Sequence, residues 1–177
     1  TRAFAGGHGI LERPRGDIPP ELKSTFDNFQ QDLKDKYGDE YAEEMFFRRH
    51  ITIFPNIQLM EFKLRIIQPV AVDKTIIYEF PIELIGTSDE VNTAIRTRLF
   101  KEVSISSGSP VSGMVNADDV EIYARTQTGL SSGHMAWLRF GRGIHREKSE
   151  RDYEWSGQDM DELPQRSLYR EWLKQMT

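Results

Sequence analysis

The sequence contains no cysteine among its 177 residues. Disulfides, thiolate zinc sites and cysteine-ligated iron–sulfur clusters are therefore excluded within this chain. Basic residues are also too few to give a positive charge: 23 Lys and Arg stand against 28 Asp and Glu, and the formal net charge is −5. Nucleic acids and anionic membranes bind basic surfaces, so we expect neither as a partner.

Long apolar runs are missing as well. No stretch approaches the roughly 20 residues that span a bilayer, and the N-terminus lacks the basic-then-apolar pattern of a secretory signal. A balance of 38% hydrophobic and 29% charged residues is typical of a globular domain. We therefore expect a soluble, cytoplasmic protein with one core. The chain opens at Thr1 without a methionine, and we expect it to begin inside a larger protein.

Apolar residues at helical spacing predict five helices. They cover residues 20–37, 40–48, 88–106, a stretch that begins near 117, and 161–176. The stripes that we expect to face the core are Leu22, Phe26, Phe29 and Leu33 in the first helix, Val91, Ile95, Leu99 and Val103 in the third, and Leu168, Trp172 and Leu173 in the last.

Alternating and β-branched residues predict strands at 50–54, 57–62, 63–70 and 75–84, with a further strand edge around the glycines at 6–9. Short turns join these segments, with no crossover helices between them. The sequence therefore predicts an α+β fold in which an antiparallel sheet carries a helix layer on one face. Residues 134–143 fit either a strand or an irregular return.

Two adjacent carboxylates, Asp118 and Asp119, follow a loop rich in Gly, Ser and Pro. Asn116 can cap the helix that begins here, and both carboxylates then fall in its first turn, where the helix dipole favours negative charge. An ordinary acidic first turn of a surface helix explains this pattern. A metal ligand that points inward explains it as well, and the local sequence leaves both interpretations open.

Six segments of the sequence match, in the same order, segments of a known protein family. They are Gly7-His8-Gly9, residues 49–60 (RHITIFPNIQLM), residues 65–75 (RIIQPVAVDKT), Asp118-Asp119, Arg142-Gly143, and Tyr169, Trp172 and Met176 of the last helix. Together they resemble the catalytic domain of the large (α) subunit of Rieske-type, ring-hydroxylating non-haem iron oxygenases, from about residue 6 to the C-terminus. The resemblance is greatest to members that act on aromatic acids such as benzoate or salicylate. It implies a helix-grip (START-like, Bet v 1-like) fold, in which the sheet wraps a long C-terminal helix.

The resemblance also implies a mononuclear Fe(II) held by two histidines and one carboxylate, with open positions for dioxygen chemistry. The matching carboxylate is Asp119, and Asp118 would then be its capping neighbour. In the family the two histidines precede the Gly-His-Gly turn, and the Rieske 2Fe–2S cluster lies further upstream. None of the four histidines here matches them: His8, His50, His134 and His145. We therefore expect residues 1–177 to be the C-terminal part of the catalytic domain, without the Rieske domain.

Four residues match substrate-binding positions of the family: His50, Met60, Val115 and Tyr123. His50 is suited to hydrogen-bond a carboxylate or ring substituent, but a histidine satisfied at a strand edge explains it as well. Met60 and Tyr123 are also ordinary core-packing residues. His8 is expected to be structural or to lie at the edge of the pocket.

For the intact protein the resemblance implies hydroxylation of an aromatic substrate with dioxygen. Electrons would come from NAD(P)H through a reductase or ferredoxin partner, and the protein would be a homotrimer or an α/β hetero-oligomer. The fragment alone is expected to be inactive. Two alternatives stay open: a metal-free START-like module that binds an apolar ligand, and a scaffold at a subunit interface, which abundant exposed apolar surface would favour.

Overall fold

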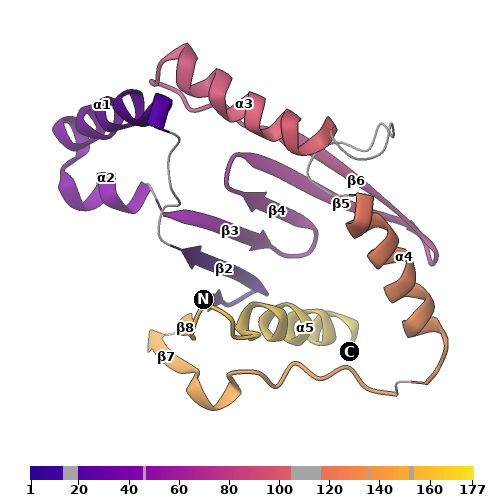
Figure 1. Ribbon diagram of the computed structural model, residues 1–177. Coiled ribbons are helices and arrows are strands. Elements are labelled where there is room, and N and C mark those ends of the chain that lie inside the picture. Colours follow the sequence, from indigo (N-terminus) through magenta and orange to yellow (C-terminus); the bar gives the residue numbers. More distant parts are fainter. Residues whose placement is uncertain (14–19, 46, 105–116, 135, 152–153) are drawn as a thin grey trace.

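The computed structural model describes residues 1–13, 20–45, 47–104, 117–134, 136–151 and 154–177 (Figure 1). The strands are β1 (Arg2–Phe4), β2 (His8–Arg13), β3 (Arg48–Ile53), β4 (Ile57–Met60), β5 (Lys63–Ala71), β6 (Lys74–Pro81), β7 (Lys148–Arg151) and β8 (Glu154–Ser156). The helices are α1 (Pro20–Tyr37), α2 (Asp39–Met45), α3 (Asp89–Ser104), α4 (Ala117–Ser131), α5 (Leu163–Met176) and the short 3-10 helix η1 (Ile144–Arg146).

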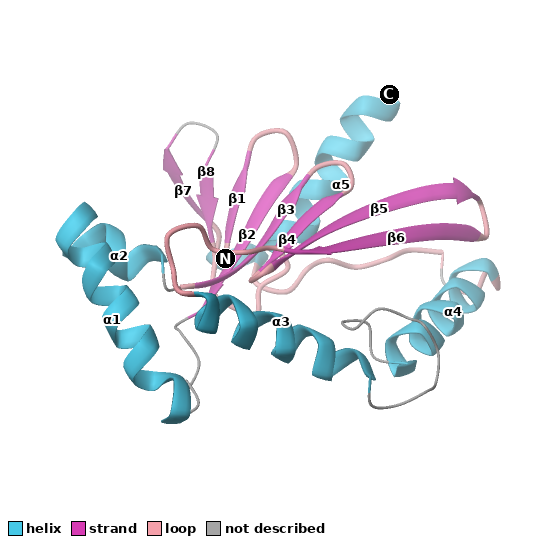
Figure 2. Ribbon diagram, turned by 90° about the horizontal axis from the view of Figure 1, so that it is seen from above, coloured by secondary structure: helices cyan, strands magenta, loops and turns pink. Residues whose placement is uncertain are grey.

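All eight strands form one sheet in the order β6-β5-β4-β3-β2-β1-β8-β7, and every neighbouring pair is antiparallel. Helix α5 packs across β1 and β2, beside the N-terminus (Figure 1). The predicted α+β fold, an antiparallel sheet with a C-terminal helix against it, is therefore confirmed. Figure 2 shows the strands fanning apart because the sheet twists strongly.

The strand register divides the side chains between two faces of the sheet. We call the inner face the one that carries Gly9, against which α5 packs. Its other members include Leu11, His50, Met60, Lys63, Arg65 and Glu79. The outer face carries Ile10, Ile51, Ile53, Ile57, Leu59, Leu64, Ile66, Ile76, Tyr78 and Phe80.

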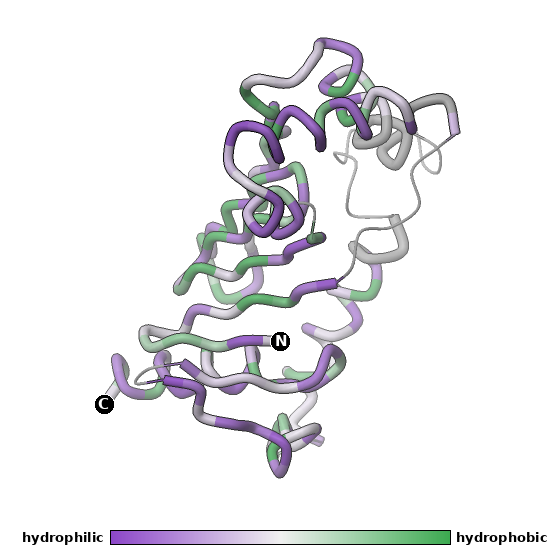
Figure 3. Tube along the Cα trace, turned by 90° about the vertical axis from the view of Figure 1, so that its left-hand side faces the viewer, coloured by the Kyte–Doolittle hydropathy of each residue, from purple (hydrophilic) through white to green (hydrophobic). Residues whose placement is uncertain are grey.

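The outer face leaves much apolar surface in water. Ile53, Tyr78 and Phe80 are 41%, 43% and 47% exposed, and Figure 3 shows hydrophobic segments along the strands of the sheet. Leu64, Ile66 and Gln68 also share this face. The fully buried core is small by comparison and lies mostly at the helices, with Ala3 of β1 as its member on the sheet.

Two clusters form that helical core. Phe29 and Leu33 of α1 pack against Ala42 of α2, while Val91 and Ile95 form a second cluster on α3. Leu84 contacts both clusters. These contacts confirm Phe26, Phe29 and Leu33 of the first expected stripe and Val91 and Ile95 of the third. The side chains of Leu22, Leu99 and Val103 lie outside the described residues. No described helix is long and apolar enough to cross a membrane.

Three expectations differ from the structure in detail. The stripe of the last helix is one of them, since Trp172 and Leu173 were expected to face the core but are 48% and 56% exposed. The second helix ends at Met45 and β3 begins at Arg48, whereas the helix was expected to run to residue 48. Arg48 and Arg49 are in a strand because they pair with Arg13 and Glu12 of β2 in the β2–β3 ladder. The β7–β8 hairpin was not expected from sequence. The described part of residues 134–143 is an irregular return, which was one of the two interpretations left open.

Candidate functional site

The Gly7-His8-Gly9 turn lets α5 approach the sheet. Gly7 has a φ of +79°, and a Cβ on it would lie 2.8 Å from Glu171 Cβ and 3.1 Å from the Phe54 ring. A Cβ on Gly9 would lie 2.8 Å from Pro164 Cβ. Side chains at either position would push the helix away, which accounts for both glycines.

His8 has a structural role, as expected for it. Its Nδ1 accepts a hydrogen bond of 3.1 Å from the backbone N–H of Phe54, so the proton of the neutral ring sits on Nε2. Phe54 and Pro55 are joined by a cis peptide bond. Asn56 then ties this turn to β5, donating to Ile67 O at 3.1 Å and accepting from Ile67 N–H at 2.9 Å.

The structure brings together two of the predicted site residues. His50 of β3 and Met60 of β4 are register partners and share the inner face. The His50 side chain is 41% exposed, and its Nε2 lies 3.8 Å from Glu61 Oε1. Glu61 occupies the β4–β5 turn with a φ of +52°.

The other predicted site residues lie on or before α4. Asp119 falls in the first turn of this helix, as predicted, but its side chain is not among those described. Tyr123 lies one turn further on and is half exposed. Val115 lies outside the described residues. A hydrogen bond of 3.4 Å from Gln127 Nε2 to Val72 O links α4 to the β5–β6 turn.

A shallow depression on the inner face contains two residues that sequence reasoning missed. It is lined by Leu11, Arg13, Arg48 and His50, which form two cross-strand pairs, Leu11 with His50 and Arg13 with Arg48. Alternation along β3 would have found Arg48, because a residue two positions from His50 must share its face. The expected helix through residue 48 hid this signal.

Each arginine of the depression has a carboxylate partner. Arg48 donates from Nε to Glu61 Oε1 at 2.6 Å and also pairs through Nη2 with the same oxygen. Arg13 donates from Nε to Asp159 Oδ1 at 3.2 Å. The depression therefore combines an apolar residue, an imidazole and two guanidinium groups.

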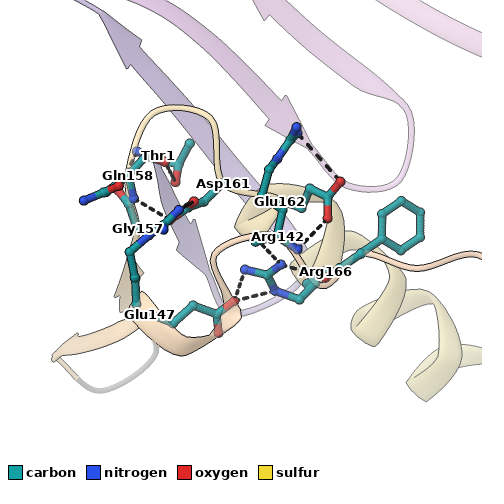
Figure 4. A network of polar contacts seen from close by, with 10 residues as sticks. Thr1, Arg142, Glu147, Gly157, Gln158, Asp161, Glu162 and Arg166 are labelled. Atoms are coloured by element: carbon teal, nitrogen blue, oxygen red, sulfur yellow. Dashed lines mark hydrogen bonds and ion pairs between the residues drawn. The ribbon is translucent and has the colours of Figure 1, made fainter.

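A polar network fixes the irregular return on α5 (Figure 4). Arg166 donates from Nη1 to Phe140 O at 2.7 Å and to Arg142 O at 2.8 Å, and its Nε bonds the Glu147 carboxylate. Arg142 N–H in turn donates to Glu162 Oε2 at 2.9 Å. Arg166 is buried. Its guanidinium binds Phe140 O, Arg142 O and the Glu147 carboxylate at the same time.

Asp161 is the second centre of this network, and its side chain is fully buried. The hydrogen bond from Arg146 lowers the pKa of Asp161, and the N–H of Gln158 adds to this at 2.9 Å, although burial acts in the opposite direction. Gly143, with a φ of +79°, lies so close that a Cβ would overlap this carboxylate. That contact explains the glycine of the Arg142-Gly143 segment.

Charged side chains of β1, β2 and β3 form ion pairs across the outer face. Burial alone would raise the pKa of Glu12, but hydrogen bonds from Arg2 and Arg49 outweigh it and the pKa is lowered. Arg2 donates to Glu12 at 2.9 and 3.0 Å, and Arg49 at 2.8 Å. This ladder stabilises β1, β2 and β3 on the face opposite the one that α5 covers.

The described residues hold no group of three or more His, Cys, Asp or Glu side chains placed to bind a metal ion. Their donor set is therefore not that of a complete iron centre, which needs two histidines and a carboxylate together.

Curated relatives of the chain are large subunits of dioxygenases. The chain is 29% identical over 147 residues to the large subunit of 2-halobenzoate 1,2-dioxygenase from Burkholderia cepacia, covering 81% of this chain and 30% of the relative. It is 29% identical over 148 residues to the large subunit of anthranilate 1,2-dioxygenase from Acinetobacter baylyi, with the same coverages. It is 30% identical over 138 residues to the alpha subunit of toluate 1,2-dioxygenase from Pseudomonas putida, covering 75% and 28%.

Solved structures agree with these relatives at the level of the fold. A naphthalene 1,2-dioxygenase variant bound to phenanthrene superposes with a TM-score of 0.70 at 15% identity, covering 97% of this chain and 40% of that one. Naphthalene 1,2-dioxygenase with indole bound gives 0.69 at 14% identity, with the same coverages. No protein-family model matches the chain.

These comparisons confirm the resemblance found in the sequence: the chain is related to the large, or alpha, subunits of ring-hydroxylating dioxygenases. It spans less than a third of the length of these curated relatives, 30% for each of the first two.

Proposed function

We propose that this chain is the C-terminal part of the catalytic domain of an aromatic-ring-hydroxylating oxygenase, and that the complete protein adds dioxygen-derived hydroxyl groups to an aromatic acid. The observation that carries the proposal is the similarity to three large subunits, which are named for 2-halobenzoate, anthranilate and toluate. Each of these names denotes a benzene ring that bears a carboxylate. The shared fold of the naphthalene dioxygenases supports the same assignment.

An iron ion held by two histidines and a carboxylate would supply the dioxygen chemistry of the proposed enzyme. The described residues do not form this set. We propose Asp119 as the single ligand that this chain contributes, on the match of the Asp118-Asp119 pair. The two histidines and the Rieske cluster would come from the upstream sequence, and NAD(P)H would supply electrons through a reductase partner.

The role of this chain is then to form a wall of the substrate pocket. His50 and Met60 lie side by side on the inner face and supply a polar and an apolar contact. Val115 and Tyr123 are proposed to complete that wall from the side of α4. An apolar wall with few polar groups orients a ring and keeps water away from it.

The test uses the complete subunit with its reductase, NADH, benzoate and isotopically labelled dioxygen. We expect labelled hydroxylated product from the wild type, a loss of at least about a hundredfold in rate for Asp119→Asn, and near wild-type rates for Asp118→Asn. Equal rates for the two variants would contradict the role of Asp119. An absence of labelled product from the wild type would refute the function itself. Residues 1–177 alone are expected to form no product.

The apolar outer face supports a second role within the same protein. Ile53, Tyr78 and Phe80 leave much of their surface in water, and large apolar patches are typical of interfaces. We therefore propose that the complete protein is an oligomer, a homotrimer or an α/β complex, that buries this face. Sedimentation of the complete subunit tests this: Phe80→Lys should reduce assembly, and unchanged assembly would argue against the face.

A further inference from the structure

We propose that the depression lined by Leu11, Arg13, Arg48 and His50 binds the carboxylate of an aromatic acid, with Arg48 as the residue that recognises the anion. The inference rests on the proposed function, from which it takes the class of substrate, and it names the specificity residue.

Geometry places an apolar surface and a cation side by side. Leu11, His50 and Met60 form one row across β2, β3 and β4 on the inner face, and Arg13 and Arg48 form the adjacent row on β2 and β3. Neighbouring strands lie about 4.8 Å apart, so the row of three spans about 9.6 Å and is wide enough to lie along a benzene ring. A carboxylate on that ring would reach the arginine row.

The guanidinium of Arg48 keeps donors available. Glu61 engages only its Nε and Nη2, and Nη1 makes no hydrogen bond or ion pair to any residue in the described ranges. The side chain is 39% exposed. Arg13 is tied to Asp159 at 3.2 Å and is 45% exposed. A planar guanidinium with free N–H groups is the donor best suited to a carboxylate.

Glu61 orients the Arg48 side chain. Its carboxylate lies 3.8 Å from His50 Nε2 as well as against Arg48, so it links the two polar residues of the depression. With one edge of the guanidinium fixed on Glu61, the side chain loses less rotamer freedom when an anion binds to the other edge.

The experiment compares three probes on the protein of residues 1–177: benzoate, its neutral isostere benzamide, and acetate. Dissociation constants are measured by NMR titration at constant ionic strength. We expect benzoate to bind about tenfold tighter than either other probe, because only benzoate offers both a ring and an anion to a charged donor. Equal binding of benzoate and benzamide, or of benzoate and acetate, would overturn the proposal, and so would no binding of benzoate.

Two matched variants locate the effect. Arg48→Gln should remove the preference for benzoate over benzamide, whereas Arg49→Gln should keep it, because Arg49 lies on the outer face with Glu12 and Glu44. Retained preference in Arg48→Gln refutes the assignment. Circular dichroism verifies folding. If Arg48→Gln does not fold, the preference for benzoate over benzamide is measured in Arg48→Lys instead, and the wild-type comparison of the three probes still tests the proposal. Because no iron or oxygen is involved, failure here is distinct from failure of the hydroxylation assay.

Discussion

At Gly143 a single hydrogen atom in place of a side chain lets the return before β7 reach Asp161, just ahead of α5. Its φ of +79° is unfavourable for other residues, and a methyl group would overlap the Asp161 carboxylate. We expect Gly143→Ala to lower the free energy of unfolding by at least about 2 kcal/mol, measured by urea denaturation. Gly141→Ala is the matched control, since a Cβ there meets nothing within 4 Å. Similar losses for both variants would contradict this account.

Glu79 forms ion pairs with two buried cations on the inner face. Arg65 donates to it from Nε at 2.8 Å and pairs through Nη2 at 2.6 Å, and Lys63 Nζ lies 3.7 Å away. Lys63 and Arg65 are 2% and 7% exposed. Removing the partner of a buried ion pair typically costs about 3–5 kcal/mol, and we expect such a loss for Glu79→Ala.

The exposed pair of Glu83 and Arg96 provides the comparison for Glu79. The Glu83 side chain is 59% exposed, and pairs of this kind contribute about 0–1 kcal/mol. Thermal and urea unfolding of Glu83→Ala should therefore differ little from the wild type. An equal effect of the two substitutions would show that burial does not govern these pairs.

At the scale of elements, we expect opposite effects on stability when Gly9 and Gly129 are each replaced by alanine. Gly9 faces Pro164 of α5 at 2.8 Å, whereas Gly129 lies inside α4 with open space around it. Gly9→Ala should destabilise the fold by displacing α5, while Gly129→Ala should raise the helicity and stability of α4 by up to about 1 kcal/mol. Circular dichroism with urea titration measures both. Stabilisation by Gly9→Ala would disprove the close packing of α5.

The elements that sequence predicted well are those set by local patterns. Apolar spacing marked α1 and α3 through Phe29, Leu33, Val91 and Ile95, and all four are buried. Alternating residues predicted the strand at 63–70, which is β5 in the structure. The Asp119 position in the first turn of α4 also followed from the local cap and charge pattern.

The elements that sequence missed depend on partners far along the chain. Strand β3 begins at Arg48 because β2 pairs with it, although local spacing favours helix there. Hairpin β7–β8 joins the sheet through β1, at the opposite end of the chain. The site residue Arg48 was missed for the same reason, since its face is defined only once the strand is known.

At the scale of the whole molecule, Asp161 and Glu12 make stability depend on acid. Both have a lowered pKa in the folded state, through Arg146 for Asp161 and, against the effect of burial, through Arg2 and Arg49 for Glu12. Their stabilisation is therefore complete above the unfolded values of about 4 and is lost as pH falls through the folded values. The urea midpoint of unfolding should decrease once the pH drops below about 4. This decrease should be less steep in Asp161→Asn than in Asp159→Asn. Identical pH profiles would contradict the assignment.

The central claim is that this chain contributes one carboxylate to an iron centre completed elsewhere in the protein. The most direct measurement is the iron content of the complete subunit in the wild type, Asp119→Asn and Asp118→Asn, each verified for folding. We expect stoichiometric iron in the wild type and in Asp118→Asn, and a large loss in Asp119→Asn, because a facial triad that lacks its carboxylate holds Fe(II) weakly. Full iron content in Asp119→Asn would show that this residue is not a ligand and would contradict the account.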